Sequence, residues 1–358
     1  MRTDLFDYHL PKELIAATPA EKRDASRLLV LHRDSQTLEH AVFARLGNYL
    51  TSGDLLVIND SRVIRARLHG KRMATGGHVE LLLVERHSPA SNAGKDTWLV
   101  LCRPARKLKP GEMVYFANKR LTARILHYAG EGERIVEFDC PNVLEWLDQI
   151  GEVPLPPYIV QRRRELFGPR HEVLPEDVER YQTVYAREPG SVAAPTAGLH
   201  FTTELMESLK QQGVRFARVT LHVGPGTFKP VEAEEIEQHR MHVEHYSIPN
   251  ETVTAIEETR RMGKRVVAVG TTVVRTLEAA ADEEGRVQSG DGATDLMIVP
   301  GYRFRVIDAL ITNFHLPRST LLMLVAAFAG REFVLRAYEE AVAQRYRFYS
   351  YGDAMLIL

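Results

Sequence analysis

The chain has 358 residues, of which 44% are hydrophobic, and its formal net charge is −1. This length and composition are enough for an ordinary buried core, in two domains or in one large domain with an insertion. Two cysteines exclude a disulfide framework and a cysteine-based metal cluster, which favours a reducing cytoplasm. The longest apolar run, residues 321–330, is well short of the roughly 20 residues of a membrane helix, so we expect no membrane segment.

The charge is distributed unevenly along the chain. Residues 61–130 contain 14 Lys/Arg and 4 Asp/Glu, whereas acidic residues outnumber basic ones in the rest. A solvated lysine-rich surface would have acidic residues interspersed. The asymmetry therefore favours a polyanionic partner, most often a nucleic acid.

The first predicted elements are short. Residues 27–32 (R-L-L-V-L-H) are typical of a strand, and residues 40–50 predict a helix that ends near Gly53. The apolar run at 54–59 predicts a buried strand. It leads directly into a basic stretch that begins at Arg62.

The next segment has the signature of β structure. Five or six short apolar runs between residues 66 and 152 are separated by Gly, Pro, Asn or Ser turns, which predicts a small β-barrel. We therefore expect an inserted β-barrel domain at 66–151. Residues 1–65 and 152–358 would together form one discontinuous α/β catalytic domain.

Strand and helix patterns alternate in the last third of the chain. Helices are expected from an acidic stretch at 233–245 and over 250–262, and strands over 264–270 and 296–301. This alternation is typical of a mostly parallel sheet with helices on its faces. The fold class we expect is thus α/β with an inserted small barrel, in which the terminal apolar strand pairs with strands from both segments of the catalytic domain.

A loop of small residues lies at 191–201 (S-V-A-A-P-T-A-G-L-H-F) and precedes a helix that Thr202 or Thr203 would cap. Such a loop leaves backbone N–H groups free and lets a ligand approach the main chain, with His200 beside it as a titratable group. This pattern fits a binding site that contains a base. A turn whose histidine merely packs on the helix fits it equally well.

A strand, a glycine and two threonines precede a helix at 269–275 (V-G-T-T-V-V-R). Ligands of open α/β sheets bind beyond the carboxyl ends of the strands, where helix N-termini offer N–H groups. A plain capped helix is the alternative. The chain contains neither G-x-G-x-x-G nor G-x-x-x-x-G-K-[ST], so neither a dinucleotide site nor a P-loop is supported.

Other histidines are candidates for chemistry. His239, His242 and His245, with Glu244, have a spacing that a metal site on a helix would use, but a helix end with dipole-complementing histidines is favoured because no H-E-x-x-H motif is present. His315, in T-N-F-H-L-P-R-S-T, is either a site residue or a hydrogen-bonded core histidine. Its polar neighbours favour a site.

Taken together, several stretches closely resemble one enzyme family, the S-adenosylmethionine:tRNA ribosyltransferase-isomerases of queuosine biosynthesis. The stretches are D-Y-H-L-P, S-R-L-L-V-L, G-D-L-L-V-I-N-D-S-R-V-I, A-P-T-A-G-L-H-F, L-H-V-G-P-G-T-F-K-P-V, H-R-M-H-V-E, V-G-T-T-V-V-R-T-L-E, I-T-N-F-H-L-P-R-S-T-L-L-M-L-V-A-A-F-A-G and Y-S-Y-G-D-A-M-L-I.

The resemblance implies a reaction. The ribosyl part of S-adenosylmethionine would be transferred and isomerised onto the aminomethyl group of 7-aminomethyl-7-deazaguanine at the tRNA wobble position, giving epoxyqueuosine-tRNA, adenine and methionine. A sulfonium acidifies the C5′ hydrogens, so a base of near-neutral pKa suffices to begin, and an acid must assist the leaving adenine. No cofactor and no metal are expected, because S-adenosylmethionine is consumed as the ribosyl donor. We expect a cytoplasmic monomer with tRNA as its partner.

The resemblance and the loops together predict the site. S-adenosylmethionine would lie between residues 194–200, 222–227 and 270–275, with His200 as the base, His222 as second choice, and His315 and Glu244 as candidates for proton delivery to adenine. Arg275 would pair with the ligand's carboxylate. The expected ligand-binding residues are Pro195, Thr196, Gly198, Gly224, Gly226, Thr227, Gly270, Thr271, Thr272 and Arg275. The basic clusters expected to bind tRNA are Arg62, Arg65, Lys71, Arg72, Arg106, Lys107, Lys109, Arg162, Arg163 and Arg164.

Overall fold

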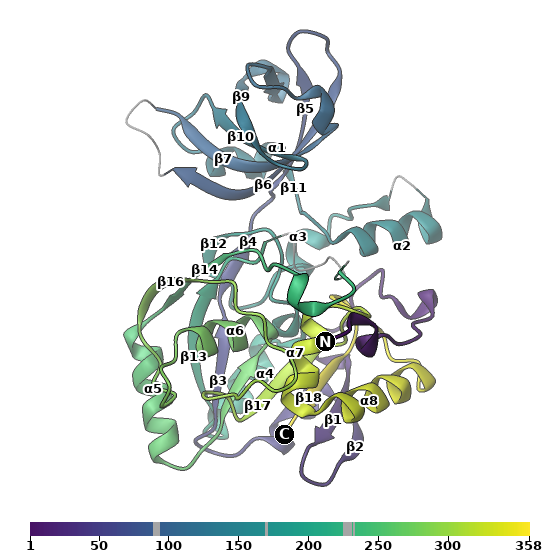
Figure 1. Cartoon of the computed structure of the whole chain (residues 1–358), viewed down its shortest axis with the longest axis vertical. Helices are drawn as coiled ribbons and strands as arrows, with labels where there is room; N and C mark the ends of the chain where they lie inside the picture. The colour runs from purple at the N-terminus through teal and green to yellow at the C-terminus, as the bar shows by residue number, and fades with distance from the viewer. Residues whose placement is uncertain (89–93, 169–170, 225–230, 232) are drawn as a thin grey trace.

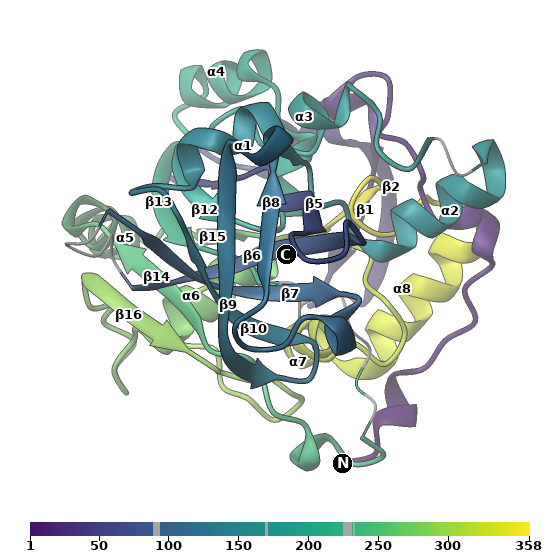
Figure 2. The same ribbon diagram turned by 90° about the horizontal axis from the view of Figure 1, so that it is seen from above.

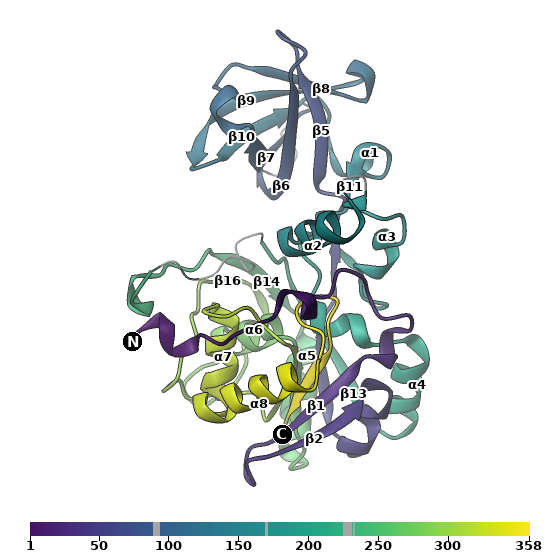
Figure 3. The same ribbon diagram turned by 90° about the vertical axis from the view of Figure 1, so that its right-hand side faces the viewer.

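The computed structural model describes residues 1–88, 94–168, 171–224, 231 and 233–358. A barrel stands on a larger domain in which helices cover a twisted sheet (Figure 1). Figure 2 looks down onto the barrel, and Figure 3 shows the same stacking from the side.

The larger domain is built on a mixed sheet, to which the described residues contribute nine strands. Pairing is parallel from β13 through β3 and β15 to β17 and between β18 and β1, and antiparallel elsewhere. The strands, in spatial order, are β16 (Gly290–Thr294), β14 (Glu244–Ile248), β13 (Arg215–Leu221), β3 (Leu55–Asn59), β15 (Val266–Val269), β17 (Ala309–Asn313), β18 (Ala354–Ile357), β1 (Arg27–His32) and β2 (Thr37–Val42). The terminal strand β18 pairs with β17 and β1, which confirms that it joins both segments of the chain.

Alternate residues of the central strands point to opposite faces, so the sheet separates two apolar cores. Leu55 and Val57 face the core formed with α5, α6, α7 and α8, whereas Leu56 and Ile58 face the core under α4 and the turn η4. The α/β fold with helices on both faces is therefore confirmed. The helices are α4 (Thr203–Gln211), α5 (Asn250–Arg261), α6 (Thr271–Ala279), α7 (Thr320–Ala329) and α8 (Arg331–Ala343).

The barrel is closed, because β5 pairs with both β6 and β8. Its inward-facing side chains, such as Leu68, Leu81 and Val100, form a separate core. The inserted barrel expected from the turn pattern is thus confirmed, while the boundaries of 66–151 as an independent domain stay a prediction. Its strands, in order around the barrel, are β5 (Arg67–Arg72), β6 (His78–Ser88), β7 (Asp96–Arg103), β10 (Glu133–Phe138), β9 (Leu121–Gly130) and β8 (Met113–Phe116). After α1 (Leu144–Ile150), the short strand β11 (Gly151–Glu152) pairs with β5.

Short elements connect the two bodies. The chain enters the barrel through β4 (Ser61–Val63), which pairs with β12 (Glu188–Ser191), and leaves it through α2 (Pro157–Phe167) and α3 (Asp177–Arg180). Since β3 runs directly into β4, the carboxyl edge of the parallel strands faces the barrel (Figure 1). The imidazole of His245 on β14 also lies 3.1 Å from the carboxylate of Glu85 on β6.

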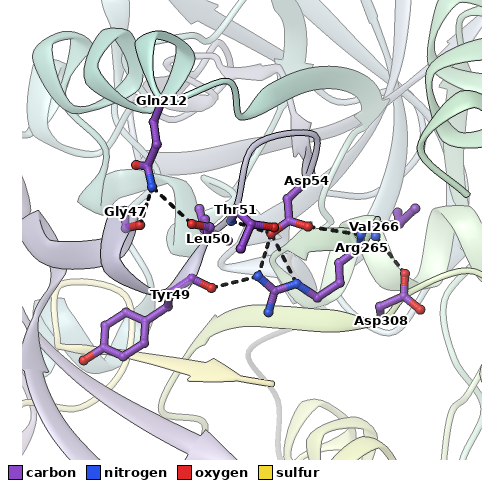
Figure 4. A network of polar contacts seen from close by, with 9 residues as sticks. All are labelled: Gly47, Tyr49, Leu50, Thr51, Asp54, Gln212, Arg265, Val266 and Asp308. Carbon is purple, nitrogen blue, oxygen red and sulfur yellow. Dashed lines mark hydrogen bonds and ion pairs between the residues drawn. The ribbon is translucent and has the colours of Figure 1, made fainter. Parts of the chain in front are cut away.

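A polar network closes the opposite edge of the sheet, where β3 and β15 begin (Figure 4). The buried carboxylate of Asp54 accepts hydrogen bonds from the backbone N–H groups of Thr51 and Arg265 and from the Arg265 guanidinium, while Asp308 accepts from the N–H of Val266. Burial alone would raise the pKa of Asp54, but these donors outweigh it and hold that pKa below its usual range. The backbone N–H groups at the start of β15 thereby have acceptors. The edge of the sheet that can face a ligand lies at the opposite, carboxyl end of the parallel strands.

Three sequence-based elements are wrong. Residues 40–50 form the end of β2 and the 3-10 turn η4 instead of an α-helix, and residues 233–245 give one 3-10 turn followed by β14. Residues 296–301 lie outside any strand. In the second case, pairing with β13 and β16 supplies the hydrogen bonds that a helix would have made, so tertiary context overrides the local pattern. The 3-10 turns are η1 (Thr3–Phe6), η2 (Lys12–Leu14), η3 (Arg23–Ala25), η4 (Phe43–Tyr49), η5 (Ala105–Lys107), η6 (Ala117–Lys119), η8 (Thr196–His200) and η10 (Ile236–Gln238).

Candidate active site

A cleft opens at the carboxyl edge of β15 and β17, with about 640 Å³ of space that is partly open to solvent. Parallel strands bring their carboxyl-end loops to one edge, which is where α/β folds bind ligands. The loop before η8 and the turn after β17 meet there with the start of α6. The lining residues are Tyr158, Ala194, Pro195, Thr196, Ala197, Val223, Gly270, Thr271, Thr272, Thr312, Asn313, Phe314, His315, Leu316, Ser319, Leu321, Tyr349 and Ser350.

The N-terminus of α6 forms one wall of the cleft. Gly270 precedes the helix with φ +97°, a left-handed conformation that favours glycine, and its N–H is fixed by the carbonyl of Ile311 at 2.8 Å. Thr271 and Thr272 open the helix, and its N-cap residue, Gly270, has no side chain to cap it. The first-turn N–H groups and the positive end of the helix dipole suit a carboxylate.

His315 is positioned in the cleft by hydrogen bonds from both its side chain and its backbone. Its Nε2 lies 2.8 Å from Thr312 Oγ1, its N–H donates to the hydroxyl of Tyr338, and its carbonyl accepts from the hydroxyl of Tyr8. Within the described part of the chain, the hydrogen bond of the His315 ring is made by Nε2 and not by Nδ1. Burial lowers the pKa of His315 to about 3, so the imidazole is neutral.

His200, the base expected from the sequence, lies outside the lining of this cleft. Its ring packs against Phe43, Nδ1 lies 2.7 Å from Ser26 Oγ, and Nε2 lies 3.2 Å from Asn313 Nδ2. It is 4% exposed, and burial lowers its pKa to about 3. Both ring nitrogens are therefore engaged with protein groups.

The loop before His200 contributes differently from residue to residue. Pro195 and Thr196 line the cleft. Gly198 is buried, and a Cβ there would stand 2.0 Å from the hydroxyl of Tyr185. The glycine is thus required by packing against that tyrosine, rather than by a ligand.

His222 lies in a separate groove, beside Tyr246 and Asp291 on the β13, β14 and β16 edge of the sheet. Its ring packs against Gly190, and burial lowers its pKa. The structure therefore does not bring His222 and His315 into one pocket.

Arg275 and Glu244 form a buried ion pair with each other. The Arg275 guanidinium donates to the Glu244 carboxylate, which also accepts from the N–H of Gly224, and Arg275 donates to the carbonyl of Leu296. The two side chains are 3% and 6% exposed. Neither lines the cleft, so the expected contact between Arg275 and a ligand carboxylate is not prepared in this structure. Gly226 and Thr227, two further predicted ligand residues, lie outside the described residues.

The histidines considered as metal ligands do not lie together on one helix. His239 follows a single 3-10 turn and His245 lies on a strand, so helical spacing does not apply. Among the residues that the structure describes, no group of three His, Cys, Asp or Glu side chains has the geometry to hold a metal ion.

The basic residues predicted to bind tRNA lie in two regions of the structure, with Arg163 as an exception. Lys71 and Arg72 end β5, and Arg106, Lys107 and Lys109 lie at the turn after β7; Arg62, Arg65, Arg162 and Arg164 lie where the barrel joins the α/β domain.

The exception is Arg163, which is fully buried and forms two hydrogen bonds to the carboxylate of Asp177 and one to the carbonyl of Ala17. It cannot reach a phosphate, so its assignment to tRNA binding is wrong. Several of the others have acidic neighbours: Arg72 pairs with Glu112, and Arg164 pairs with Glu172. Lys71, Arg106, Lys107 and Lys109 are exposed.

Among the cleft residues that the sequence did not predict are Tyr158, Thr312, Tyr349 and Ser350. Tyr158 directly follows the proline-rich stretch at 154–157, which carries no local signal of a site. The other three carry no local signal beyond their place in family-like stretches, because strand ends and turns attract such residues generally.

The comparisons with known proteins agree with this architecture. A family model described as queuosine biosynthesis protein matches residues 3–357, so the chain belongs to that family. The S-adenosylmethionine:tRNA ribosyltransferase-isomerases of Symbiobacterium thermophilum and Thermotoga maritima are 54% and 53% identical over 359 and 361 residues, covering 100% of each chain. The crystal structure of S-adenosylmethionine tRNA ribosyltransferase from Thermotoga maritima superimposes with a TM-score of 0.54 and 43% identity, covering 99% of this chain and 100% of that one. No helix among the described residues is long and apolar enough to cross a membrane.

Proposed function

We propose that the protein is an S-adenosylmethionine:tRNA ribosyltransferase-isomerase. It transfers and isomerises the ribosyl moiety of S-adenosylmethionine onto the aminomethyl group of 7-aminomethyl-7-deazaguanine at the wobble position of tRNA, and releases adenine and methionine. Relatives of that name match the chain over its whole length at more than 50% identity. The observation that carries the site assignment is a cleft that combines a helix N-terminus with one neutral, partly unengaged histidine.

The cleft suits two charged groups of the donor, its carboxylate and its sulfonium. The methionyl carboxylate fits at the N-terminus of α6, next to Thr271 and Thr272. The rings of Tyr158 and Tyr349, with centroids 4.7 Å apart, line the same cleft and offer aromatic faces to the sulfonium.

His315 replaces His200 as the proton-transfer group in this proposal. Its Nδ1 accepts a proton from C5′, which the adjacent sulfonium acidifies, and the C5′–H electron pair remains on carbon. Because burial keeps the pKa of the imidazole low, the imidazolium holds its proton weakly and delivers it to the departing adenine nitrogen. One group thus serves both proton transfers, and Glu244 is not needed in its buried pair.

The basic residues of the barrel and of α2 support tRNA binding. The carboxyl edge of the sheet faces the barrel (Figure 1). A tRNA held by both bodies would thus present its anticodon loop to the cleft at that edge. We further propose that the enzyme uses no cofactor or metal, acts as a monomer, and works in the cytoplasm, where tRNA is modified.

Incubation with S-adenosylmethionine labelled in its ribose and with tRNA carrying the precursor base tests the proposal. We expect label in the tRNA and one equivalent of free adenine. Retention of tRNA on the protein without label transfer would instead indicate a binding protein without this activity. Prior treatment with EDTA should leave the rate unchanged, and a loss of rate that zinc or magnesium restores would contradict the metal-free part.

A further inference from the structure

Asn313 is the last residue of β17, 2% exposed, and it lines the cleft. Its amide nitrogen donates to the carbonyl of Tyr349 at 3.2 Å and lies 3.2 Å from His200 Nε2. A backbone carbonyl accepts only, so the contact with Tyr349 identifies that end of the amide as nitrogen.

The same contacts determine the tautomer of His200. Because Asn313 donates at Nε2, this nitrogen must be the acceptor, and the ring proton is on Nδ1, which donates to Ser26 Oγ. The Ser26 hydroxyl in turn donates to the carbonyl of Arg23. Every donor in this series of hydrogen bonds has an acceptor, so the orientation of the Asn313 amide is determined by buried protein groups.

One polar atom of the Asn313 side chain takes no part in these hydrogen bonds. The side-chain oxygen of Asn313 is buried and has no hydrogen-bond partner among the described residues. Asn313 lines the cleft and its amide nitrogen is held by Tyr349 and His200, so the oxygen is the polar atom of this amide that remains for a ligand. A buried carbonyl held without a donor is a costly arrangement that a ligand N–H would relieve.

The surroundings select the kind of donor. Among the described residues that line the cleft there is no Asp, Glu, Lys or Arg. An ammonium group at this oxygen would be left without a counter-charge. A neutral N–H group next to Phe314 and Leu316 needs none. Of the polar groups of S-adenosylmethionine, the exocyclic amine of adenine is a neutral N–H donor attached to a flat aromatic ring.

Resting on the proposed function, we propose that the side-chain oxygen of Asn313 accepts a hydrogen bond from the exocyclic amine of adenine and thereby selects the adenine-containing donor. His200 is then a positioning residue, which holds the Asn313 amide in the required orientation and takes no part in proton transfer.

The first experiment compares ligands by calorimetric titration. The probes are S-adenosylmethionine and its purine counterpart, which carries hydrogen in place of the exocyclic amine. We expect the wild-type protein to bind the counterpart about 10- to 100-fold more weakly. In Asn313→Ala the two should bind within about twofold of each other, because the acceptor is gone.

Equal binding of both probes by the wild type overturns the proposal, and this comparison needs no variant. Full discrimination in a folded Asn313→Ala or Asn313→Ser protein overturns it as well. Turnover of labelled S-adenosylmethionine by the wild type is measured in parallel. Absence of turnover with intact discrimination would contradict the proposed function while leaving the amine contact standing.

The second experiment separates positioning from proton transfer at His200. Gln in place of His200 offers an acceptor to Asn313 and a donor to Ser26, whereas Leu offers neither. We expect His200→Gln to keep kcat within about threefold and to keep the pH profile of the wild type, and His200→Leu to lose the discrimination between the two probes. A loss of about 10²-fold or more in kcat for His200→Gln, at unchanged KM, would show that His200 moves the proton and overturn its positioning role.

Discussion

Thr312 Oγ1, near the end of β17, lies 2.8 Å from Nε2 of His315 in the turn that follows this strand. This contact holds one ring nitrogen and directs the other, Nδ1, away from the threonine. Positioning by a hydroxyl, instead of a carboxylate, leaves the imidazole without a charged partner. The ring is therefore suited to pass a proton on rather than to retain it.

We expect His315→Gln to lower single-turnover adenine release by about 10² to 10⁴-fold, the usual contribution of a positioned proton-transfer group. Binding of S-adenosylmethionine should change by no more than a few fold, since the cleft walls remain. The control is His32→Gln, because His32 ends β1 at the opposite edge of the sheet. Near-wild-type release by His315→Gln would contradict the assignment.

Buried histidines also make stability depend on pH. Burial lowers the pKa of His200 and of His315 to about 3, against about 6.5 in an unfolded chain. The unfolded state therefore binds more protons between these values, so stability is complete above about pH 6.5 and decreases as the pH falls towards 3. We expect His200→Gln to reduce the slope of unfolding free energy against pH by up to about 1.4 kcal/mol per pH unit between pH 6 and 4. Urea unfolding of both proteins across that range measures the difference, and identical slopes would show that His200 is not held neutral by the fold.

Neighbouring arginines on α2 should behave in opposite ways. Arg163→Met leaves the buried Asp177 without its guanidinium partner and should destabilise the protein by about 3–5 kcal/mol. Arg164→Met, which affects an exposed ion pair with Glu172, should leave the melting temperature close to that of the wild type. Thermal unfolding of the two variants decides the matter, and a similar loss in both would mean that burial does not distinguish them.

The turn after β7 should contribute to tRNA binding through charge. Changing Arg106, Lys107 and Lys109 together to Gln should weaken binding, and the slope of log K against log salt should fall by about 0.7 to 0.9 for each phosphate that the variant no longer neutralises. Filter binding at several salt concentrations gives both quantities. Matched replacement of Lys210, Arg261 and Arg345, which are exposed on the α/β domain, should leave both unchanged. An unaltered slope in the first variant would exclude this turn from the tRNA interface.

Local patterns in the sequence were sufficient for much of the architecture. The apolar runs of β1 and β3 predicted strands, and Thr202 accepts the N–H of Leu205 as an N-cap should. The turn-rich segment predicted a barrel. These features depend on residues within a few positions of one another, so periodicity and capping preferences reveal them.

Only the tertiary structure decided the roles of individual polar residues. His200 sits in a loop that suits a base and a core histidine equally, and the decision came from Ser26, 174 positions away, and Asn313, 113 positions away. Arg162, Arg163 and Arg164 are indistinguishable by composition, yet helical geometry turns the middle one towards Asp177. Burial and hydrogen bonding, which determine the pKa and reach of a side chain, are imposed by parts of the chain that the local sequence does not contain.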